Sequence, residues 1–243
     1  SLSSRPLIFT NANFLGYINR KDKLVIPYMY QNGRDFSEGL AAVKKNNKWG
    51  YIDKKGKLVI PFRYDNALSF SCGLAGICIN YVWGFINKKG KLIIPRTFLK
   101  ITSFSEGLAA VYYVNKNQWY YINTKGKDVI KFFHFPFNKN PFSFSQGMAP
   151  IQHDVTRKWG YINKKGRLII PFKYEGALPF SENLAAVKKN NKWGYIDKKG
   201  RLIIKYQFEG VRSFYCNRAA VSKGYKQGFI NKRGKIVIPI VFG

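Results

Sequence analysis

The sequence is poor in acidic residues and in the side chains that metal sites use. It has 12 Asp or Glu against 42 Lys or Arg, with 3 cysteines and 2 histidines. Cys72, Cys78 and Cys216 are too few and too irregularly spaced for a disulfide framework or a zinc site. We therefore expect no metal centre and no cofactor.

Sequence motifs of common enzyme chemistry are missing as well. There is no glycine-rich phosphate loop, no serine nucleophile elbow and no pairing of cysteine with histidine. His134 and His153 lie in dissimilar contexts, so each is expected to be a loop or packing residue. The acidic residues recur at equivalent places in the repeat described below, which is typical of turn residues. The sequence therefore predicts a protein that is not an enzyme.

Long apolar runs are absent too. No stretch approaches the length of a transmembrane helix, and no hydrophobic leader is present in the sequence. The chain begins Ser1-Leu2-Ser3-Ser4 without a methionine, so the removal of a signal peptide stays open. Localisation is uncertain from the residues alone, and the oligomeric state is unknown.

The sequence has a large excess of positive charge. The formal net charge is +30, while 46% of the 243 residues are hydrophobic and 17% are aromatic, so a folded core is expected. Such charge favours an anionic partner: a nucleic acid, an anionic glycan or an acidic membrane surface. The alternative is that lysines keep an edge-rich β protein soluble.

A short block, Gly or Tyr followed by Tyr or Phe, Ile, and Asn or Asp, recurs along the chain. Its first residue falls at positions 16, 50, 84, 120, 160, 194 and 228, so most copies are 34 residues apart. A fixed period of this size indicates a repeat architecture. We expect one repeat-array domain, residues 1–243, with approximate repeats 5–35, 36–69, 70–103, 104–143, 144–179, 180–213 and 214–243.

Each repeat has the pattern of three short strands and no helix. In residues 36–69 the predicted strands are residues 40–43, 49–53 and 57–62. Asn46-Asn47 is a hairpin turn, and in the next turn Asp53 is expected to accept a backbone N–H while Gly56 takes positive φ. The sequence predicts an all-β tandem array of three-stranded repeats.

In the third strand of each repeat, the side chains on one face and those on the other are both apolar. We therefore expect this strand to be buried on both faces. Its proline cannot donate to a β-ladder and is expected at a strand end or a sheet edge. The tryptophan before most blocks is expected to pack between repeats. The prolines and tryptophans are Pro27, Pro61, Pro95, Pro171, Pro239, Trp49, Trp83, Trp119, Trp159 and Trp193.

The stretch KWGYIDKKGKLVIPF, residues 48–62, resembles the bacterial WG repeat, also called the KWG repeat. The likeness runs from about Pro6 to Pro239 and is weaker at Leu15-Gly16, Trp119-Tyr120 and Gln227-Gly228. The resemblance implies a β-rich scaffold from a bacterium, secreted or on the cell surface, although a cytoplasmic location stays possible. It implies no catalytic residue, because the family motif contains none.

The repeats are expected to form an open solenoid or superhelix. A propeller blade usually has four strands, and the predicted repeat has three, with none left over to close a ring. The alternative is a seven-bladed propeller-like ring.

The second turn of each repeat concentrates basic residues. In a regular array these turns align, which predicts an anion-binding ridge. Its residues are Lys21, Lys23, Lys54, Lys55, Lys57, Lys88, Lys89, Lys91, Lys125, Lys127, Lys164, Lys165, Arg167, Lys198, Lys199, Arg201, Lys232, Arg233 and Lys235.

The sequence leaves two functions open. The first is a binding module whose ridge engages an anionic polymer, either an envelope glycan or a nucleic acid. The second is a protein-interaction or assembly scaffold that uses the repeat edges or the Phe-rich segment 131–147, with Phe132, Phe133, Phe135 and Phe137 as a possible interface.

Overall fold

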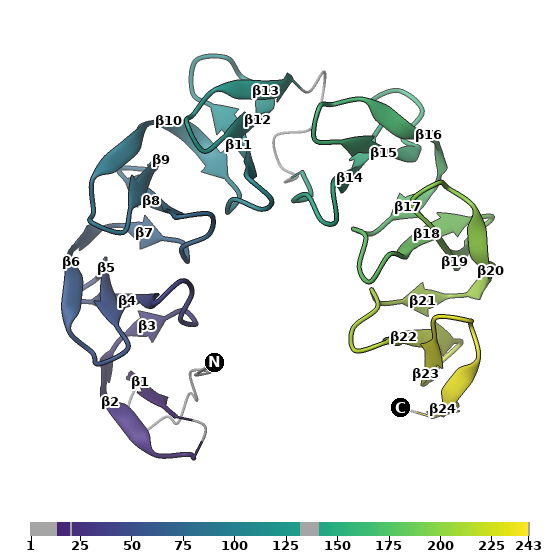
Figure 1. Ribbon diagram of the computed structural model, residues 1–243, viewed down its shortest axis with the longest axis horizontal. Helices are drawn as coiled ribbons and strands as arrows, with labels where there is room; N and C mark the ends of the chain where they lie inside the picture. The colour runs from purple at the N-terminus through teal and green to yellow at the C-terminus, as the bar shows by residue number, and fades with distance from the viewer. Residues whose placement is uncertain (1–13, 20, 132–140, 243) are drawn as a thin grey trace. The chain divides into compact units, whose positions relative to one another are not determined.

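The computed structural model describes residues 14–19, 21–131 and 141–242. The chain divides into two compact units, Ser1–Lys131 and Phe132–Gly243, and each is described by itself (Figure 1). All regular secondary structure of the described residues is β-strand, and none of the sheets is closed. The predicted all-β class is confirmed.

The first unit contains antiparallel sheets of two, four and seven strands. Their strands are β1 (Leu15–Ile18) and β2 (Leu24–Tyr30); β3 (Asn32–Gly33), β4 (Leu40–Lys45), β5 (Lys48–Asp53) and β6 (Leu58–Tyr64); and β7 (Asn66–Ala67), β8 (Leu74–Ile79), β9 (Val82–Asn87), β10 (Leu92–Ile101), β11 (Leu108–Tyr113), β12 (Trp119–Asn123) and β13 (Asp128–Lys131). The strands within each sheet lie side by side in chain order.

The second unit contains one three-stranded and two four-stranded antiparallel sheets. Their strands are β14 (Met148–Gln152), β15 (Trp159–Asn163) and β16 (Leu168–Tyr174); β17 (Gly176–Ala177), β18 (Ala185–Lys189), β19 (Lys192–Ile196) and β20 (Leu202–Phe208); and β21 (Gly210–Val211), β22 (Arg218–Lys223), β23 (Lys226–Asn231) and β24 (Ile236–Phe242).

The predicted count of three strands per repeat is wrong for the complete sheets. A two-residue strand in the linker, such as Asn66–Ala67, pairs with the strand that follows it and adds a fourth. Two residues carry too little alternation to be predicted as a strand from the sequence. The absence of a fourth strand therefore no longer argues against a propeller.

The expectation that the third strand is buried on both faces is also wrong. In β6, Ile60 is 1% exposed, but Leu58 and Val59 are 43% and 40% exposed. The reason is that β6 lies at the edge of its sheet. The turn of the next repeat, at Gly90, covers Ile60 and leaves Leu58 and Val59 exposed. The third strands therefore expose pairs of aliphatic side chains.

The prolines of these strands lie where the ladder does not need an N–H. Pro61 is in the edge strand β6, as predicted, between the pairs Tyr51↔Ile60 and Trp49↔Tyr64, where the register shifts. This bulge brings the Ile60 carbonyl oxygen to 2.6 Å from where a Cβ on Gly50 would lie. The glycine of the Trp-Gly pair is therefore required by the close approach of the third strand.

The core lies between successive repeats of each unit. Tyr51 donates its hydroxyl to the Leu68 carbonyl at 2.8 Å, and its ring meets Phe70 edge-on at a centroid distance of 4.9 Å. Ser37 Oγ donates to the Phe70 carbonyl at 2.6 Å. Similar pairings recur at Tyr17, Tyr161 and Tyr195. Within each unit, these repeats thus share their packing and hydrogen bonds with the next repeat.

The tryptophans belong to this packing. Trp49 and Trp119 are buried, and the other three are partly buried against the same clusters or a neighbouring ring. Arg34 lies over the Trp49 ring and donates through Nε to the Ala67 carbonyl at 2.7 Å. The expectation that the tryptophans pack between repeats is confirmed at Trp49, Trp83, Trp159 and Trp193.

Candidate functional site

The lysine-rich turn has the geometry that the sequence predicts. Asp53 Oδ1 accepts the backbone N–H groups of Lys55 and Lys57, both at 2.9 Å, and Gly56 has a φ of 83°. Asparagine or aspartate makes the same two hydrogen bonds at residues 19, 87, 123, 163, 197 and 231. The side-chain oxygen fixes the turn and leaves the lysine side chains to point outward.

Five of the turns pack on the third strand of the preceding repeat in the same unit. A Cβ on Gly56 would lie 3.4 Å from Ile26, and one on Gly90 would lie 3.4 Å from Ile60. The other such pairs are Gly126 with Ile94 in the first unit, and Gly200 with Ile170 and Gly234 with Ile204 in the second. Within each unit, successive turns therefore lie on the same end of neighbouring sheets.

Most of the predicted ridge residues are exposed. Lys198 and Lys232 are half-buried, and the other seventeen are exposed. Ion pairs join Lys88 Nζ to Glu38 at 3.2 Å, Lys232 Nζ to Glu182 at 2.9 Å and Arg201 Nε to Asp197 at 2.6 Å. The structure thus brings the basic turns into rows within each unit, while acidic side chains neutralise some of their members.

Two of the acidic partners, Glu38 and Glu182, join neighbouring repeats. Glu182 also accepts the backbone N–H of Asn217 at 3.0 Å, and Glu38 accepts that of Gly73 at 3.1 Å. The hydrogen bond from Lys232, followed by that from Asn217, lowers the pKa of Glu182 from its ordinary value. These carboxylates are therefore structural caps of the next turn.

The opposite end of the sheets carries a second set of carboxylates. Asp65 accepts the Asn80 N–H at 2.7 Å and pairs with Lys48 Nζ at 2.6 Å. Glu209 does the same with the Gly224 N–H at 2.6 Å and Lys192 at 2.9 Å. Because each carboxylate closes a hairpin, the predicted turn role of the acidic residues is confirmed at these positions.

The predicted Phe interface falls mostly outside the described residues. Phe132, Phe133, Phe135 and Phe137 are not described, and neither is His134. Of the same segment, Phe144 is 1% exposed, and Phe142 meets the Trp159 ring at a centroid distance of 5.7 Å. These two rings pack inward, and the interface itself stays a prediction.

The other polar candidates show no catalytic or metal arrangement in the described part of the chain. His153 Nδ1 accepts N–H groups of Val155 and Thr156 at 3.3 Å, and its ring lies against Phe172. No group of three His, Cys, Asp or Glu there could hold a metal ion, and the three cysteines carry free thiols. The described residues also contain no helix long and apolar enough to cross a membrane.

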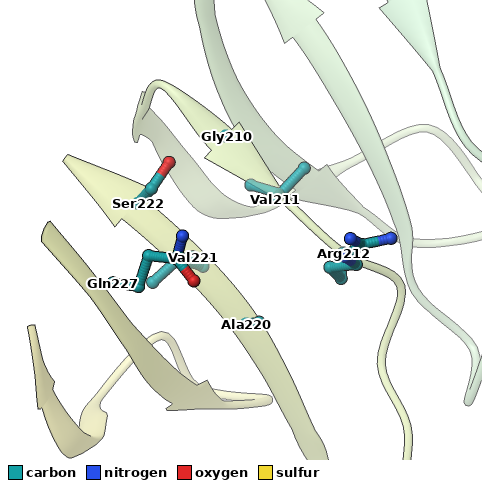
Figure 2. Close-up of a pocket in the computed structure, with 7 residues that line it drawn as sticks. All are labelled: Gly210, Val211, Arg212, Ala220, Val221, Ser222 and Gln227. Carbon is teal, nitrogen blue, oxygen red and sulfur yellow. The ribbon is translucent and has the colours of Figure 1, made fainter. Parts of the chain in front are cut away.

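The surface formed by the described residues includes two small hollows. One, of about 260 Å³, lies along β21 to β23, and Figure 2 shows the polar ends of Arg212, Ser222 and Gln227 spread along it rather than meeting at one point. The other, of about 220 Å³, is mainly apolar and lies between Tyr17, Val25, Phe36 and the turn residue Lys54. Neither combines a nucleophile with a base.

Sequence reasoning missed one cluster, around Lys116. Tyr113, Tyr120 and Asp128 surround its ammonium group. The available signal was that these three residues replace Lys, Gly and Leu of the repeat at residues 45, 50 and 58. Comparison of the repeats position by position would have found them.

Comparison with solved structures finds propeller-like folds. A eukaryotic initiation factor is 14% identical, with a TM-score of 0.62 over 99% of this chain and 74% of that one. KlHsv2 with loop 6CD replaced by a Gly-Ser linker is 9% identical, with a TM-score of 0.53 over 95% and 93% of the two chains. At these identities the likeness shows the fold alone.

A virginiamycin B lyase from Staphylococcus aureus also matches, at 15% identity and a TM-score of 0.47 over 99% of this chain and 89% of that one. No curated protein matches the chain.

The family comparison agrees with the repeat pattern. The WG containing repeat matches residues 16–49, 49–83, 83–116, 159–193, 193–226 and 228–243. The unmatched stretch between 116 and 159 holds the copy with Tyr120 in place of glycine. The six matches cover well over half of the residues, and the chain belongs to the WG containing repeat family.

Proposed function

We propose that the chain is a non-catalytic binding module whose lysine-rich turns engage an anionic polymer, either an envelope glycan or a nucleic acid. The observation that carries this proposal is the packing of successive turns, within each unit, on the third strand of the preceding repeat, such as Gly90 on Ile60. It puts exposed basic side chains on the same end of neighbouring sheets. A polymer with regularly spaced negative charges is complementary to this series of basic turns.

The physical gain comes from relief of repulsion and from counterion release. Basic groups on adjacent turns repel each other wherever they come within the Debye length, which is about 8 Å at physiological salt. A bound polyanion offsets this repulsion and releases its own condensed ions. The ion pairs of Lys88, Arg201 and Lys232 lessen the effect locally, while the net charge of +30 remains.

The test is a charge reversal with a matched control in the same sheet. Lys54→Glu with Lys55→Glu changes the turn after β5, and Lys44→Glu with Lys45→Glu makes the same charge change at the other end of β4. Binding to heparin, duplex DNA, single-stranded RNA and teichoic acid is measured from about 50 to 200 mM salt. The turn variant is expected to weaken binding and lower the salt slope more than the control.

Equal effects of the two variants would mean that net charge, and not the turns, governs binding. Binding to no polymer would overturn the proposal. Binding to one class of polymer alone would identify the glycan or the nucleic acid as partner.

We also propose that residues 1–243 form one array in which the repeats run as an open solenoid or superhelix, with the seven-bladed ring as the alternative. The strand count no longer separates the two, because four strands also suit a propeller blade. An elongated particle in small-angle scattering would support the open array, and a compact one would support the ring.

A second function, a protein-interaction scaffold, is favoured by one specific observation. The edge strands expose aliphatic pairs such as Leu58 and Val59, and Leu202 and Ile203, each residue at least 40% exposed. Unpaired strand edges with apolar side chains are where another chain adds a strand. Leu202→Ser with Ile203→Thr is expected to abolish concentration-dependent association in sedimentation, and a strict monomer before mutation would exclude this function.

A further inference from the structure

The ammonium group of Lys116 lies in a box of two aromatic rings and a carboxylate. Its Nζ is 3.9 Å from the Tyr113 ring centroid, 4.6 Å from that of Tyr120 and 2.7 Å from Asp128 Oδ2. The Tyr113 hydroxyl donates to Asp128 Oδ1 at 2.5 Å. Two ring faces and one negative charge are the elements by which proteins bind alkylammonium groups.

The walls of this box are held independently of Lys116. The rings of Tyr113 and Tyr120 meet at a centroid distance of 5.3 Å and an angle of 89°, and Phe98 packs against Tyr113 at 4.9 Å. Tyr120 is buried, and burial, followed by the hydrogen bond to Asp128, raises the pKa of Tyr113. The phenol therefore stays protonated near neutrality and keeps the carboxylate in position.

The occupant, by contrast, is partly exposed. Lys116 lies in the hairpin between β11 and β12, and its side chain is 39% exposed, while that of Asp128 is 34% exposed. A side chain in a surface hairpin leaves its contacts more readily than a ring in the core. The box can therefore be vacated by rotation of Lys116 alone.

Three coordinated departures from the repeat produce the box. In the sheet β3–β6 the equivalent positions are Lys45, Gly50 and Leu58. Tyr120 fits where glycine is otherwise needed because β13 pairs directly through Tyr120↔Lys131 and Tyr121↔Ile130, without the register shift that follows Ile60. The change in strand pairing opens the space that the ring fills.

A structural ion pair does not require these changes. Lys48 and Asp65 form one at 2.6 Å, with side chains 48% and 37% exposed, and among the described residues no aromatic ring lies over that ammonium. The pair Lys116–Asp128 has nearly the same length and exposure. The two tyrosines are therefore what distinguishes the box.

From these contacts we infer that Tyr113, Tyr120 and Asp128 form a binding site for a quaternary ammonium group, which Lys116 occupies as an internal competitor. A trialkylammonium cation is weakly hydrated, so it loses less on leaving water than the Lys116 ammonium and gains the same attraction from the rings. The site is independent of the lysine-rich turns, and it would stand if those bound no polymer.

The experiment titrates the full chain with tetramethylammonium and choline, and detects saturation transfer from the aromatic protons to the N-methyl protons. Lys116→Ala is expected to bind at least about tenfold more tightly than the unchanged chain, because it removes the competitor. Lys116→Gln serves if alanine disturbs the hairpin. Asp128→Asn, made in the Lys116→Ala background, should lose this gain.

Lys48→Ala is the matched control and is expected to leave the affinity unchanged. Equal binding by Lys116→Ala and Lys48→Ala, or a gain that survives Asp128→Asn, would overturn the inference. Two further titrations distinguish the sources of the group: glycerophosphocholine represents a lipid headgroup, and Nε-trimethyllysine represents a modified protein. Tighter binding of either one identifies that source.

Discussion

The sheet β3–β6 and the strands β10–β13 are two versions of one repeat, and they differ at the point where the third strand meets the second. In the first, Gly50 lies under the Ile60 carbonyl, and the strand bulges around Pro61. In the second, Tyr120 takes the glycine's place and the strand pairs without that bulge. The course of the third strand thus decides whether the position of Gly50 must be glycine. A repeat whose third strand pairs without the bulge can have a large aromatic side chain there.

Proline does not decide which path the strand takes. In β20 the residue at the position of Pro61 is Lys205, yet the register still shifts between Trp193 and Tyr195. A Cβ on Gly194 would lie 2.5 Å from the Ile204 carbonyl oxygen. The bulge and the glycine go together, and the proline is one residue that tolerates the bulge.

The largest expected effect on the free energy of unfolding comes from replacing the glycine that the bulge requires. Gly50→Ala places a Cβ 2.6 Å from a backbone oxygen, so the third strand must move, and we expect a loss of at least about 2 kcal/mol in the free energy of unfolding. Urea unfolding followed by circular dichroism measures it. Gly39→Ala, at a φ of 93° with no atom within 4 Å of the new Cβ, should cost only about 1 kcal/mol of backbone strain.

The next effect concerns the hydrogen bond between sheets. Tyr51→Phe removes the hydroxyl that binds the Leu68 carbonyl and leaves the ring against Phe70, so we expect a loss of about 1 kcal/mol in urea unfolding. Phe85 is the natural comparison, because it packs on Phe104 at 4.8 Å without a hydroxyl. If Phe85→Tyr stabilised the chain as much as Tyr51→Phe destabilised it, the difference between the two sites would be the hydroxyl alone.

A smaller effect separates the two lysine–carboxylate pairs. A double-mutant cycle of Lys116→Ala and Tyr113→Leu should show a coupling of about 0.5–1 kcal/mol from the cation–π contact. Lys48 has no tyrosine beside it at the position of Tyr113, where the repeat carries Lys45, so a cycle of Lys48→Ala with Lys45→Leu should show no favourable coupling. Equal coupling in both cycles would remove the distinction between the pairs.

The smallest effect is one of pH. The hydrogen bond from Lys48, followed by that from the Asn80 N–H, lowers the pKa of Asp65 from its ordinary value. A lowered pKa in the folded state stabilises the fold above the unfolded-state pKa near 4, and the gain is lost as the pH falls through the folded value. Asp65→Asn should therefore destabilise the chain at pH 7 and make little difference near pH 2. A destabilisation that is the same at both values would contradict the assignment.

The regular features of the repeat could be predicted from the sequence. The β class, the hairpin at Asn46-Asn47 and the turn at Gly56 follow from local residue chemistry, and all are found. The fourth strand was missed because Asn66–Ala67 is defined by its pairing with Cys78 and Ile77, not by its own two residues. The exposure of Leu58 was missed because it depends on how far the next sheet reaches.

The candidate sites divide in the same way. The rows of basic turns were predictable, because periodicity alone aligns them, whereas their ion pairs with Glu38 and Glu182 depend on contacts between repeats. The box around Lys116 was not predicted, since Tyr113, Tyr120 and Asp128 come together through strand pairing and not through any short motif.

Strand β10 has a consequence for how the first unit comes apart. It runs without a break from Leu92 to Ile101, because Leu99 stands where other linkers carry Asp65, Glu175 or Glu209, and it joins two four-stranded sets into one seven-stranded sheet (Figure 1). Repeat proteins often lose their units one at a time, each opening with its own free energy. The residues from β7 to β13 should instead exchange their amide hydrogens as a single cooperative block, with β3–β6 free to open on its own.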